Sequence, residues 1–262
     1  MNFPHKQRAM AAATMLGLSF HAWAAGEEPI VPDRPGVAES SQVVGKGRFQ
    51  VETSFARERD ANGPEVVHTT TTPTLLRYGV SDSLELRVET DGRVHTWPAS
   101  TGSERGYANT ELGIKWHVAD GHGSTPSVGV LVHAELPTGS APFRGEGVRP
   151  SVRVVGEWDL PADLSLGVMP GIASDSNDNG QRFTKGILAV SLGKAWTPHF
   201  HGFVELAAPR IAHARDGGSQ FGVDAGLAYL PSDNCQVDFS VGHGLNRRTP
   251  DLSWNVGVSF RL

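Results

Sequence analysis

The chain has 262 residues, a formal net charge of −5, 19% charged residues and a mean hydropathy of −0.25. The length fits one domain made of strands, because such domains often reach about 200–250 residues. A single cysteine, Cys235, excludes an internal disulfide framework and a zinc site built from several thiolates. No apolar run approaches the ~18 residues of a membrane-spanning helix, and no run of Lys or Arg indicates a nucleic-acid partner.

Residues 1–24 have the three parts of a secretory signal peptide. A basic start precedes a run of small and apolar residues over 9–20, and small residues at Ala22 and Ala24 provide a cleavage site. We therefore expect cleavage after Ala24 and a mature protein that works outside the cytoplasm.

Residues 25–46 follow no helix or strand period at their start, where Pro29, Pro32 and Pro35 oppose regular pairing. This segment is predicted to be either a disordered periplasmic lead or a plug that folds into the domain behind it. The sequence does not distinguish the two.

From Gly47 onward the hydropathy alternates with a period of two, the pattern of strands with two unlike faces. In 83–92, for example, Leu and Val at even positions alternate with Glu, Arg and Asp at odd positions. Strands of about ten residues are long enough to cross a bilayer when they are tilted. The alternation predicts twelve strands, over 47–58, 67–79, 83–92, 106–118, 126–137, 147–160, 163–174, 182–196, 200–209, 219–230, 235–244 and 252–262.

The connections between these strands alternate between short turns and longer loops. Because outer-membrane barrels have short periplasmic turns and long outer loops, the alternation favours such a barrel over a soluble sandwich. The short connections are 80–82, 119–125, 161–162, 197–199 and 231–234. The longer connections are 59–66, 93–105, 138–146, 175–181, 210–218 and 245–251.

The two faces of the predicted strands differ in chemistry. One face is rich in aliphatic and aromatic residues, and the other mixes charged residues with His, Ser, Asn and Gly. In the dry core of a sandwich, each charge on the second face would need a partner. The sequence therefore predicts an all-β fold, a membrane-spanning antiparallel up-and-down β-barrel of about twelve strands over 47–262, with its apolar face toward lipid. Aromatic residues near the strand ends would form its girdles: Trp116, Trp158, Trp196, Tyr229 and Trp254.

The last predicted strand alternates from Trp254 through Phe260 to Leu262. Outer-membrane barrels commonly end in this way. We therefore expect the barrel-assembly machinery to recognise the C-terminal strand, and outer-membrane lipid to contact the outward face.

Two groups of motifs lie toward the ends of the chain. The first comprises Asp33-Arg34-Pro35-Gly36, Glu39-Ser40, Gly47-Arg48-Phe49-Gln50-Val51-Glu52 and Leu75-Leu76-Arg77-Tyr78-Gly79-Val80-Ser81-Asp82. The second comprises Asp224-Ala225-Gly226-Leu227-Ala228-Tyr229-Leu230, Gln236-Val237-Asp238 and Gly257-Val258-Ser259-Phe260-Arg261-Leu262. From about residue 33 to 262 the chain resembles the outer-membrane transporter family labelled "MetA-pathway of phenol degradation". The resemblance implies a barrel in the bacterial outer membrane that passes aromatic or hydrophobic compounds.

The alternation also places charged residues on the face predicted to line the lumen. They would form either a selectivity region that favours cations or neutral solutes, or a cross-strand network of ion pairs that packs the interior. A barrel of about twelve strands lies between filled and open barrels in size, so both interpretations stay open. The predicted lumen residues are Glu52, Glu85, Arg87, Glu89, Glu111, Lys115, His117, His133, Glu135, Arg149, Arg153, Glu157, Glu205, Asp224 and Asp238.

Glycines and prolines at particular strand positions carry further predictions. Gly113, Gly129, Gly167 and Gly226 lie at lumen-facing positions, where a missing side chain would leave room. Pro150 and Pro170 lie on the predicted lipid face, and each removes a ladder donor. We expect a local bulge or gap in strand pairing there, through which an apolar solute could leave sideways.

No metal site, cofactor or catalytic site is predicted. His117, His133 and His201 come from different strands without a short ligand spacing, and the chain lacks Gly-x-Ser-x-Gly. We therefore expect no enzyme but a channel for passive uptake of small hydrophobic or aromatic solutes. The alternatives are a structural or adhesive barrel with no open pore, and a lipid-modifying barrel enzyme.

Overall fold

The computed structural model describes residues 28–98, 102–177 and 179–262. The predicted signal peptide lies outside these residues. Within them, no helix has the length and apolar character needed to cross a membrane.

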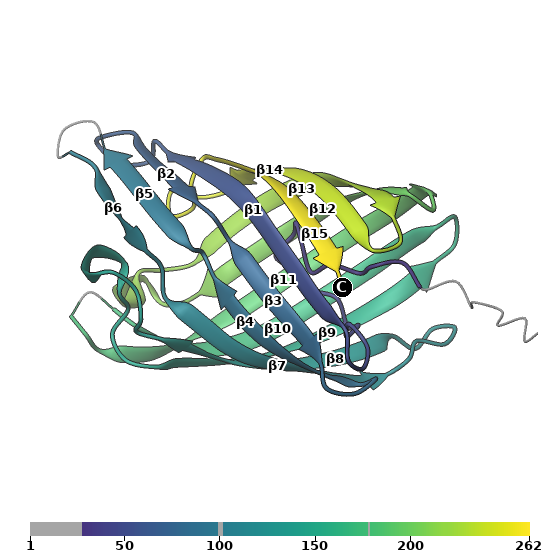
Figure 1. Cartoon of the computed structure of the whole chain (residues 1–262). Coiled ribbons are helices and arrows are strands. Elements are labelled where there is room, and N and C mark those ends of the chain that lie inside the picture. Colours follow the sequence, from purple (N-terminus) through teal and green to yellow (C-terminus); the bar gives the residue numbers. More distant parts are fainter. Residues whose placement is uncertain (1–27, 99–101, 178) are drawn as a thin grey trace, which may run out of the picture.

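The described residues form fifteen strands and two short 3-10 helices (Figure 1). The strands are β1 (Phe49–Asp60), β2 (Val67–Thr71), β3 (Thr74–Gly79), β4 (Leu84–Thr90), β5 (Arg93–Pro98), β6 (Glu104–Tyr107), β7 (Thr110–Ala119), β8 (Ser127–Leu136), β9 (Arg149–Leu160), β10 (Leu164–Ser176), β11 (Arg182–Thr197), β12 (Phe200–Ile211), β13 (Gln220–Ser232), β14 (Cys235–Gly244) and β15 (Leu252–Arg261). The 3-10 helices are η1 (Ala141–Phe143) and η2 (Ala214–Asp216).

Each strand pairs antiparallel with its neighbours, and the last strand closes the sheet on the first. The ladder between β1 and β15 runs from Gln50 opposite Arg261 to Arg59 opposite Leu252. β2, β5 and β6 continue β3, β4 and β7 beyond short breaks, so the fifteen strands occupy twelve positions around a closed barrel. The predicted all-β antiparallel barrel of about twelve strands is thereby confirmed.

The prediction of one continuous strand over 67–79 is wrong, because the chain breaks at Thr72 and Pro73. Pro73 has no N–H group to donate to a ladder. Its carbonyl oxygen instead accepts a hydrogen bond from the Ser54 N–H at 3.0 Å. On the long-loop side of this break β2 pairs with β1 and β5. On the short-turn side β3 pairs with β1 and β4.

The prediction of a loop over 93–105 is also wrong, because this stretch contains β5 and the start of β6. Gly92 joins β4 to β5 with a φ of +65°, and a Cβ there would lie 2.3 Å from the Thr72 carbonyl oxygen. Only glycine permits this close approach. The predicted strand 106–118 correspondingly divides into β6 and β7. We call β2, β5 and β6 the wall extension, since they lengthen the barrel at its long-loop end (Figure 1).

Burial alternates along the strands. In β14, Val237 and Phe239 are 43% and 44% exposed, whereas Gln236 and Asp238 are 5% and 2% exposed. Apolar side chains are thus outside and polar side chains inside, the reverse of a soluble β-protein. A closed barrel that is surrounded by lipid requires this inversion.

The ladder between β9 and β10 has a gap at Pro170. Pairing reaches Val168 opposite Gly156 and resumes at Gly171 opposite Arg153 in the same register. Because Pro170 lacks a donor, the interruption is a gap rather than a bulge. Pro150, by contrast, keeps its place in the ladder between β8 and β9.

Candidate functional site

Most of residues 28–46, called the N-terminal segment below, lies inside the short-turn half of the barrel (Figure 1), while Glu28, Pro29 and Lys46 are exposed. The Ile30 N–H donates to the Asp233 carbonyl at 2.7 Å in the turn between β13 and β14. The Gly47 N–H donates to the Gly79 carbonyl at 2.8 Å, where β3 ends. Between these points the segment contacts β4, β7, β9 and β12, so it is a loop inserted into the lumen and held at both ends.

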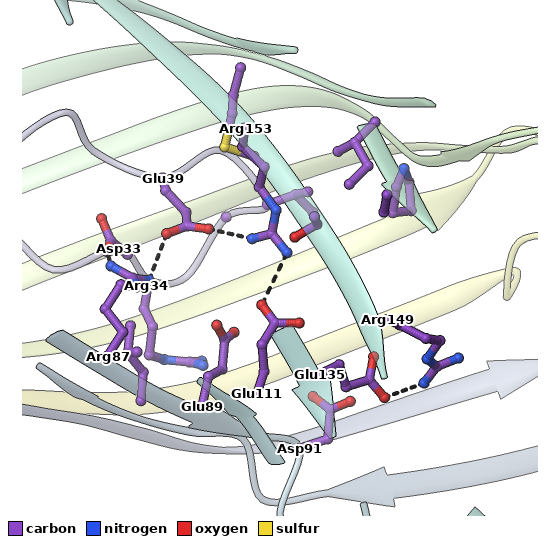
Figure 2. A pocket seen from close by; sticks show the side chains of 18 of the residues that line it. Asp33, Arg34, Glu39, Arg87, Glu89, Asp91, Glu111, Glu135, Arg149 and Arg153 are labelled. Carbon is purple, nitrogen blue, oxygen red and sulfur yellow. Dashed lines mark hydrogen bonds and ion pairs between the residues drawn. The ribbon is translucent and has the colours of Figure 1, made fainter. Parts of the chain in front are cut away.

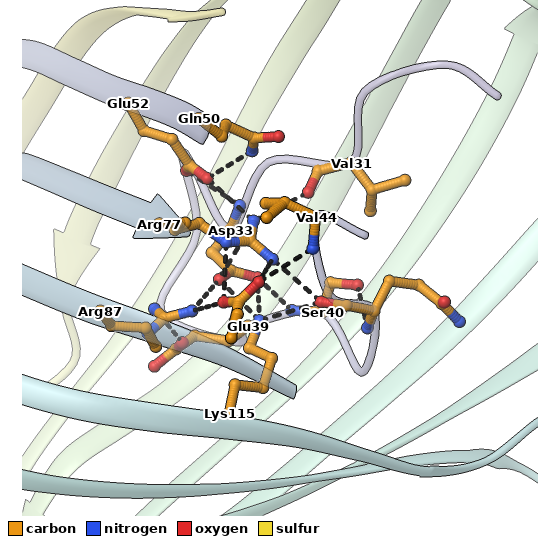
Figure 3. A network of polar contacts seen from close by, with 12 residues as sticks. Val31, Asp33, Glu39, Ser40, Val44, Gln50, Glu52, Arg77, Arg87 and Lys115 are labelled. Carbon is orange, nitrogen blue, oxygen red and sulfur yellow. Dashed lines mark hydrogen bonds and ion pairs between the residues drawn. The ribbon is translucent and has the colours of Figure 1, made fainter. Parts of the chain in front are cut away.

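Asp33 is the centre of the polar contacts of this segment (Figure 3). Its carboxylate accepts hydrogen bonds from Lys115 Nζ at 2.6 and 2.7 Å and from Arg87 Nη1 at 2.6 Å. Arg77 Nη1 lies 3.4 Å from the same carboxylate. The three cations come from the adjacent strands β3, β4 and β7 and are at most 2% exposed. One carboxylate of the segment thereby links three strands of the wall.

Arg77 joins the barrel wall to both arms of the segment. Its Nε donates to Glu85 Oε1 at 2.8 Å and its Nη1 to Glu52 Oε1 at 2.9 Å. The same guanidinium group donates to the Val31 carbonyl at 3.0 Å and to the Gln42 carbonyl at 2.9 Å. The planar guanidinium group suits this role because its five N–H donors point in fixed directions.

Glu39 extends the network toward the long-loop half of the barrel. It accepts hydrogen bonds from Arg87 Nη2 at 2.6 Å and from Arg153 Nη1 at 2.5 Å. Because an unpaired buried charge is costly, the pairing of acids with bases stabilises the cluster. Asp33, Glu39, Glu52 and Glu85 form ion pairs with Arg77, Arg87, Lys115 and Arg153, and Arg153 links this cluster to Glu111.

Carboxylates of the wall also accept hydrogen bonds from the backbone of the segment. A buried chain without regular secondary structure must satisfy its N–H groups in another way. Glu52 accepts from Asp33, Glu205 from Val37 and Ala38, Glu157 from Ser41, and Glu85 from Val44, at 2.6–3.0 Å. The segment is therefore bound from several sides of the barrel rather than from one wall.

The pKa of the Asp33 carboxyl lies well below its ordinary value. Burial alone would raise this pKa, but Arg77, Lys115 and Arg87 outweigh burial and lower it. The pKa of the Glu39 carboxyl is lowered as well. Burial and the nearby Asp33 oppose this shift, but Arg87 and Arg153 outweigh them. Both carboxylates are therefore ionised at neutral pH, and the segment is held by full charges.

The tip of the segment makes an apolar contact on the other side of the lumen. Val37 and Ala38 pack against four wall residues that are at most 1% exposed, namely Leu131, Val155, Met169 and Ala189. Apolar packing against β8 to β11 thus complements the ion pairs to β3, β4 and β7.

A cavity of about 450 Å³ lies on the long-loop side of the segment (Figure 2). Asp33, Arg34 and Glu39 of the segment line one end of it. Charged wall residues around it are Arg87, Glu89, Asp91, Glu111, Glu135, Arg149, Arg153 and Lys185. Apolar lining residues are Val37, Leu75, Met169, Ala173, Ile187 and Pro209. A cavity of about 480 Å³ beside the wall extension shares Glu89, Glu111 and Arg153 with it.

A further cavity of about 380 Å³ lies on the short-turn side of the segment. Val31, Ser40 and Gln42 of the segment line it together with Ser127 and Glu157 of the wall. The N-terminal segment therefore separates two polar cavities.

The structure places the fifteen predicted lumen residues in buried or half-buried positions. Nine contact the segment through ion pairs or hydrogen bonds: Glu52, Glu85, Arg87, Lys115, His117, Arg153, Glu157, Glu205 and Asp238. His117 Nδ1 lies 3.1 Å from the Ser41 carbonyl, and Asp238 lies 3.9 Å from Arg34 Nη2. Glu89, Glu111, Glu135 and Arg149 line the long-loop cavity. The remaining two residues are His133, which lies beside Glu111, and Asp224, which lies opposite Glu205.

Sequence reasoning missed several residues of the site, among them Asp33, Glu39 and Arg77. Asp33 and Glu39 lie in a stretch without a period, so parity could not place them. Arg77 follows the adjacent apolar pair Leu75 and Leu76, which hides the alternation of faces. The signal that could have found all three is their presence in the N-terminal motifs that carry the family resemblance.

Glu89, Glu111 and His133 bring possible metal ligands together. One ligand atom of each residue lies within 4.8 Å of the others. β4, β7 and β8 supply them, so a search for short spacing along the chain overlooks the group. Imidazole and carboxylate ligands suit zinc. However, Arg153 Nη2 lies 3.5 Å from Glu111 and would repel a cation there.

Solved structures resemble this fold at low sequence identity, while no curated protein matches the chain in sequence. The COG4313 outer membrane channel from Pseudomonas putida F1 is 10% identical with a TM-score of 0.61, over 87% of this chain and 99% of that one. The KdgM porin is 15% identical with a TM-score of 0.52, over 80% and 98%. The beta domain of the Bordetella autotransporter Brka is 12% identical with a TM-score of 0.52, over 82% and 98%.

These similarities establish the outer-membrane barrel fold and no particular task, because the three solved proteins are a channel, a porin and an autotransporter domain. The sequence family is more specific. Residues 32–262 match the family described as "Putative MetA-pathway of phenol degradation". The chain therefore belongs to this family, as the motifs at its two ends predict.

Proposed function

We propose that the protein is a channel of the bacterial outer membrane through which small solutes diffuse, with the N-terminal segment as its constriction. The observation that carries the proposal is the position of this segment between polar cavities of about 450 and 380 Å³. A barrel with only a structural or adhesive role could fill its lumen with side chains. This barrel instead leaves space on both sides of a single inserted loop.

The proposed solutes are small aromatic compounds that carry a hydroxyl or carboxylate group. Met169, Ala173 and Ile187 form an apolar part of the long-loop cavity, which Arg149 and Arg153 also line. An aromatic ring could pack on the apolar part while its polar group accepts hydrogen bonds from an arginine. The family description, which concerns phenol degradation, supports the same class of compound.

The surroundings of the barrel follow from the same proposal. Outward apolar side chains would contact outer-membrane lipid, with the short turns in the periplasm and the long loops outside. The C-terminal strand β15 would present the assembly signal to the barrel-assembly machinery. The predicted lumen residues would then act in two groups, one that holds the constriction and one that lines the solute path.

Single-channel recording in planar bilayers tests the proposal. We expect a low conductance for the wild-type protein and a several-fold higher conductance for Asp33→Asn. The substitution removes the carboxylate charge that Lys115 and Arg87 bind, so it weakens the attachment of the segment. Swelling of liposomes in benzoate at neutral pH, compared with a neutral sugar of similar size and with protein-free liposomes, measures the solute preference.

Asp163→Asn is the matched control for this experiment. The Asp163 side chain is 78% exposed in the turn between β9 and β10, and its φ of +53° is a conformation that Asn tolerates. This variant should conduct like the wild-type protein. If wild-type and Asp33→Asn barrels are both silent and exclude all solutes, the structural or adhesive alternative replaces the channel.

A further inference from the structure

The outward face of the wall extension and the adjoining end of β1 carries an unusual number of cations. The register places Arg57 opposite Thr70, and Thr70 opposite His95. His95 in turn lies opposite Arg105, and Arg93 is two positions from His95. Residues at paired positions, or two apart on a strand, share one face of a sheet. Arginines from β1, β5 and β6 are therefore on one surface.

A second row of the same face adds another arginine and an aromatic residue. Arg59 lies opposite His68, and His68 lies opposite Trp97. The Arg57 guanidinium carbon lies 5.4 Å from the centre of the Trp97 ring, a cation–π contact. We call this surface the arginine face, which comprises Arg57, Arg59, His68, Arg93, His95, Trp97 and Arg105.

The arginine face points away from the lumen. On β1, Glu52 and Ser54 are buried in the lumen, whereas Phe55 is 46% exposed and has the same parity as Arg57. The acids Glu58 and Asp60 have the opposite parity and point inward. Basic residues are therefore outside and acidic residues inside on this part of the wall.

The cations of this face lack acidic partners to match them. Arg59 forms an ion pair with Asp251, and Arg57 contacts Trp97. In the described parts of the chain, Arg93 and Arg105 are exposed and form no ion pair with a carboxylate. His68 Nδ1 and His95 Nε2 are buried without a hydrogen-bond partner. The face therefore has unused positive charge and unused hydrogen-bonding capacity.

The position of the face along the barrel corresponds to a membrane interface. Arg57 follows Phe49 by eight positions, and Arg93 follows Leu84 by nine. In both strands the outward-facing residues before the arginine are apolar residues or threonine. A tilted strand needs about 9–11 residues to cross the hydrocarbon region. The arginines thus begin where the apolar band of the same strands ends. At that depth an outward arginine costs at most about 1 kcal/mol, compared with about 2–4 kcal/mol at the bilayer centre.

Outward-facing cations on the strands are concentrated in this sector, whereas Arg144, Arg215 and Arg247 of the same rim lie in loops. At the corresponding ends of β12 and β13 the outward residues include the exposed Ile211 and Phe221. Arg182, at the end of β11, donates to the Val148 carbonyl and to Ser174 of its own barrel. A general requirement for cations at the outer rim would affect all sectors, so the concentration indicates a specific partner.

We infer that the arginine face binds the phosphate groups of the glycolipid in the outer leaflet of the outer membrane. The outer leaflet carries phosphorylated sugars at the depth where these arginines lie. Guanidinium groups bind phosphate through paired hydrogen bonds, and Trp97 is of the residue type that prefers the interface. This inference depends on the membrane location of the barrel and not on the proposed solute path.

Binding of lipid A to the purified full-length barrel in detergent tests the inference. The probes are bisphosphorylated lipid A and the same lipid without phosphates, and native mass spectrometry measures the bound fraction. We expect the triple variant Arg57→Gln/Arg93→Gln/Arg105→Gln to bind bisphosphorylated lipid A about 100-fold more weakly than the wild-type protein. Each arginine near an anionic headgroup raises the affinity by a factor of about ten or less. The dephosphorylated lipid should bind both proteins equally weakly.

A matched control removes three arginines from the long loops instead. Arg144, Arg215 and Arg247 are exposed, and the variant Arg144→Gln/Arg215→Gln/Arg247→Gln has the same net charge as the test variant. It should keep wild-type affinity. Heat-dependent mobility on gels verifies that each barrel is folded, and Arg93→Gln/Arg105→Gln replaces the triple variant if that protein does not fold. Equal affinities of the test and control variants, or equal binding of the two lipids by the wild-type protein, would overturn the inference.

Discussion

The two halves of the lumen use the same kinds of side chain in opposite ways. In the short-turn half, Arg77 and Lys115 are almost fully buried and bind carboxylates of the wall and the N-terminal segment. In the long-loop half, Glu89, Glu111 and Arg149 are half-buried around a cavity of about 450 Å³. Most of the strands run through both halves, and the alternation of their faces is the same in each half.

The difference between the halves comes from the N-terminal segment. It supplies Asp33 and Glu39 as counter-ions and donates backbone N–H groups to wall carboxylates such as Glu205. In the long-loop half the loop around η1 lines a cavity with Phe143, but none of its described residues forms an ion pair with the wall. Inward charges therefore form a packed network where the segment supplies counter-ions, whereas inward charges that the segment does not pair line the cavities beside it.

Among the variants that test this comparison, Arg77→Met is expected to have the largest effect on stability. Loss of the guanidinium group leaves Glu52 and Glu85 buried without their main cation, and breaking a buried ion pair on one side typically costs about 3–5 kcal/mol. The matched substitution in the other half is Arg149→Met, since the Arg149 side chain is 26% exposed and binds Glu135. Because water reaches the half-buried pairs of Arg149 with Glu135 and Asp175, their loss should cost less than the loss of the fully buried pairs of Arg77.

Unfolding of both variants by urea in lipid vesicles measures the difference. Arg77→Met should lower the free energy of unfolding several times more than Arg149→Met does. Proteolysis of the N-terminal segment should also be faster in Arg77→Met. Equal losses of stability would mean that the two halves are packed alike, and the comparison would fail.

A smaller effect is expected from Gly113→Ala, at the boundary between the halves. A Cβ on Gly113 would lie 1.9 Å from His133 Cδ2, so the His133 ring would have to move. Such overpacking typically costs about 1–3 kcal/mol. The matched control is Gly167→Ala, where the nearest atom to a new Cβ is Ser191 Cβ at 3.9 Å, an ordinary contact.

The background variant His133→Ala identifies the cause of the Gly113 effect. With the imidazole ring removed, Gly113→Ala should cost no more than about 0.5 kcal/mol, the usual range for a substitution without a clash. Urea unfolding of the four proteins completes the double-mutant cycle. A cost that persists in the His133→Ala background would show that the backbone at Gly113, and not the ring, sets the requirement for glycine.

The alternation along the sequence was sufficient to predict the barrel. Parity alone decides which face of a strand a side chain joins, so Glu85, Arg87 and Glu89 could be grouped without any knowledge of their partners. The prediction from parity fails where the alternation along the sequence is interrupted. Pro73 divides the predicted strand 67–79, and the stretch after Gly92 that forms β5 and the start of β6 was predicted as loop.

The pairing of the inward charges could not be predicted from the sequence. Which residues meet across the lumen depends on the register of a closed barrel and on the course of the N-terminal segment. Pro29, Pro32 and Pro35 gave that segment no period, so nothing indicated that Asp33 would meet Lys115, 82 positions away. The same reasoning explains why Glu89, Glu111 and His133 form a group that no sequence spacing reveals.

The smallest expected effect is a change in the ion selectivity of the proposed channel. Arg153→Gln removes one positive charge beside Glu39 and Glu111 at the long-loop end of the network. The ratio of cation to anion permeability should rise, by no more than about five-fold, because two unit charges 4 Å apart in water interact by about 1 kcal/mol. The reversal potential across a KCl gradient measures this ratio.

Arg182→Gln is the control for this last measurement, since Arg182 lies at the end of β11 and binds the Val148 carbonyl. The same charge is lost from the barrel, but outside the cavity, so the selectivity should stay at its wild-type value. If Arg153→Gln instead raises the conductance without changing the selectivity, Arg153 acts mainly through Glu39 to hold the segment. The boundary between the packed and open halves would then lie beyond Arg153, closer to Glu135.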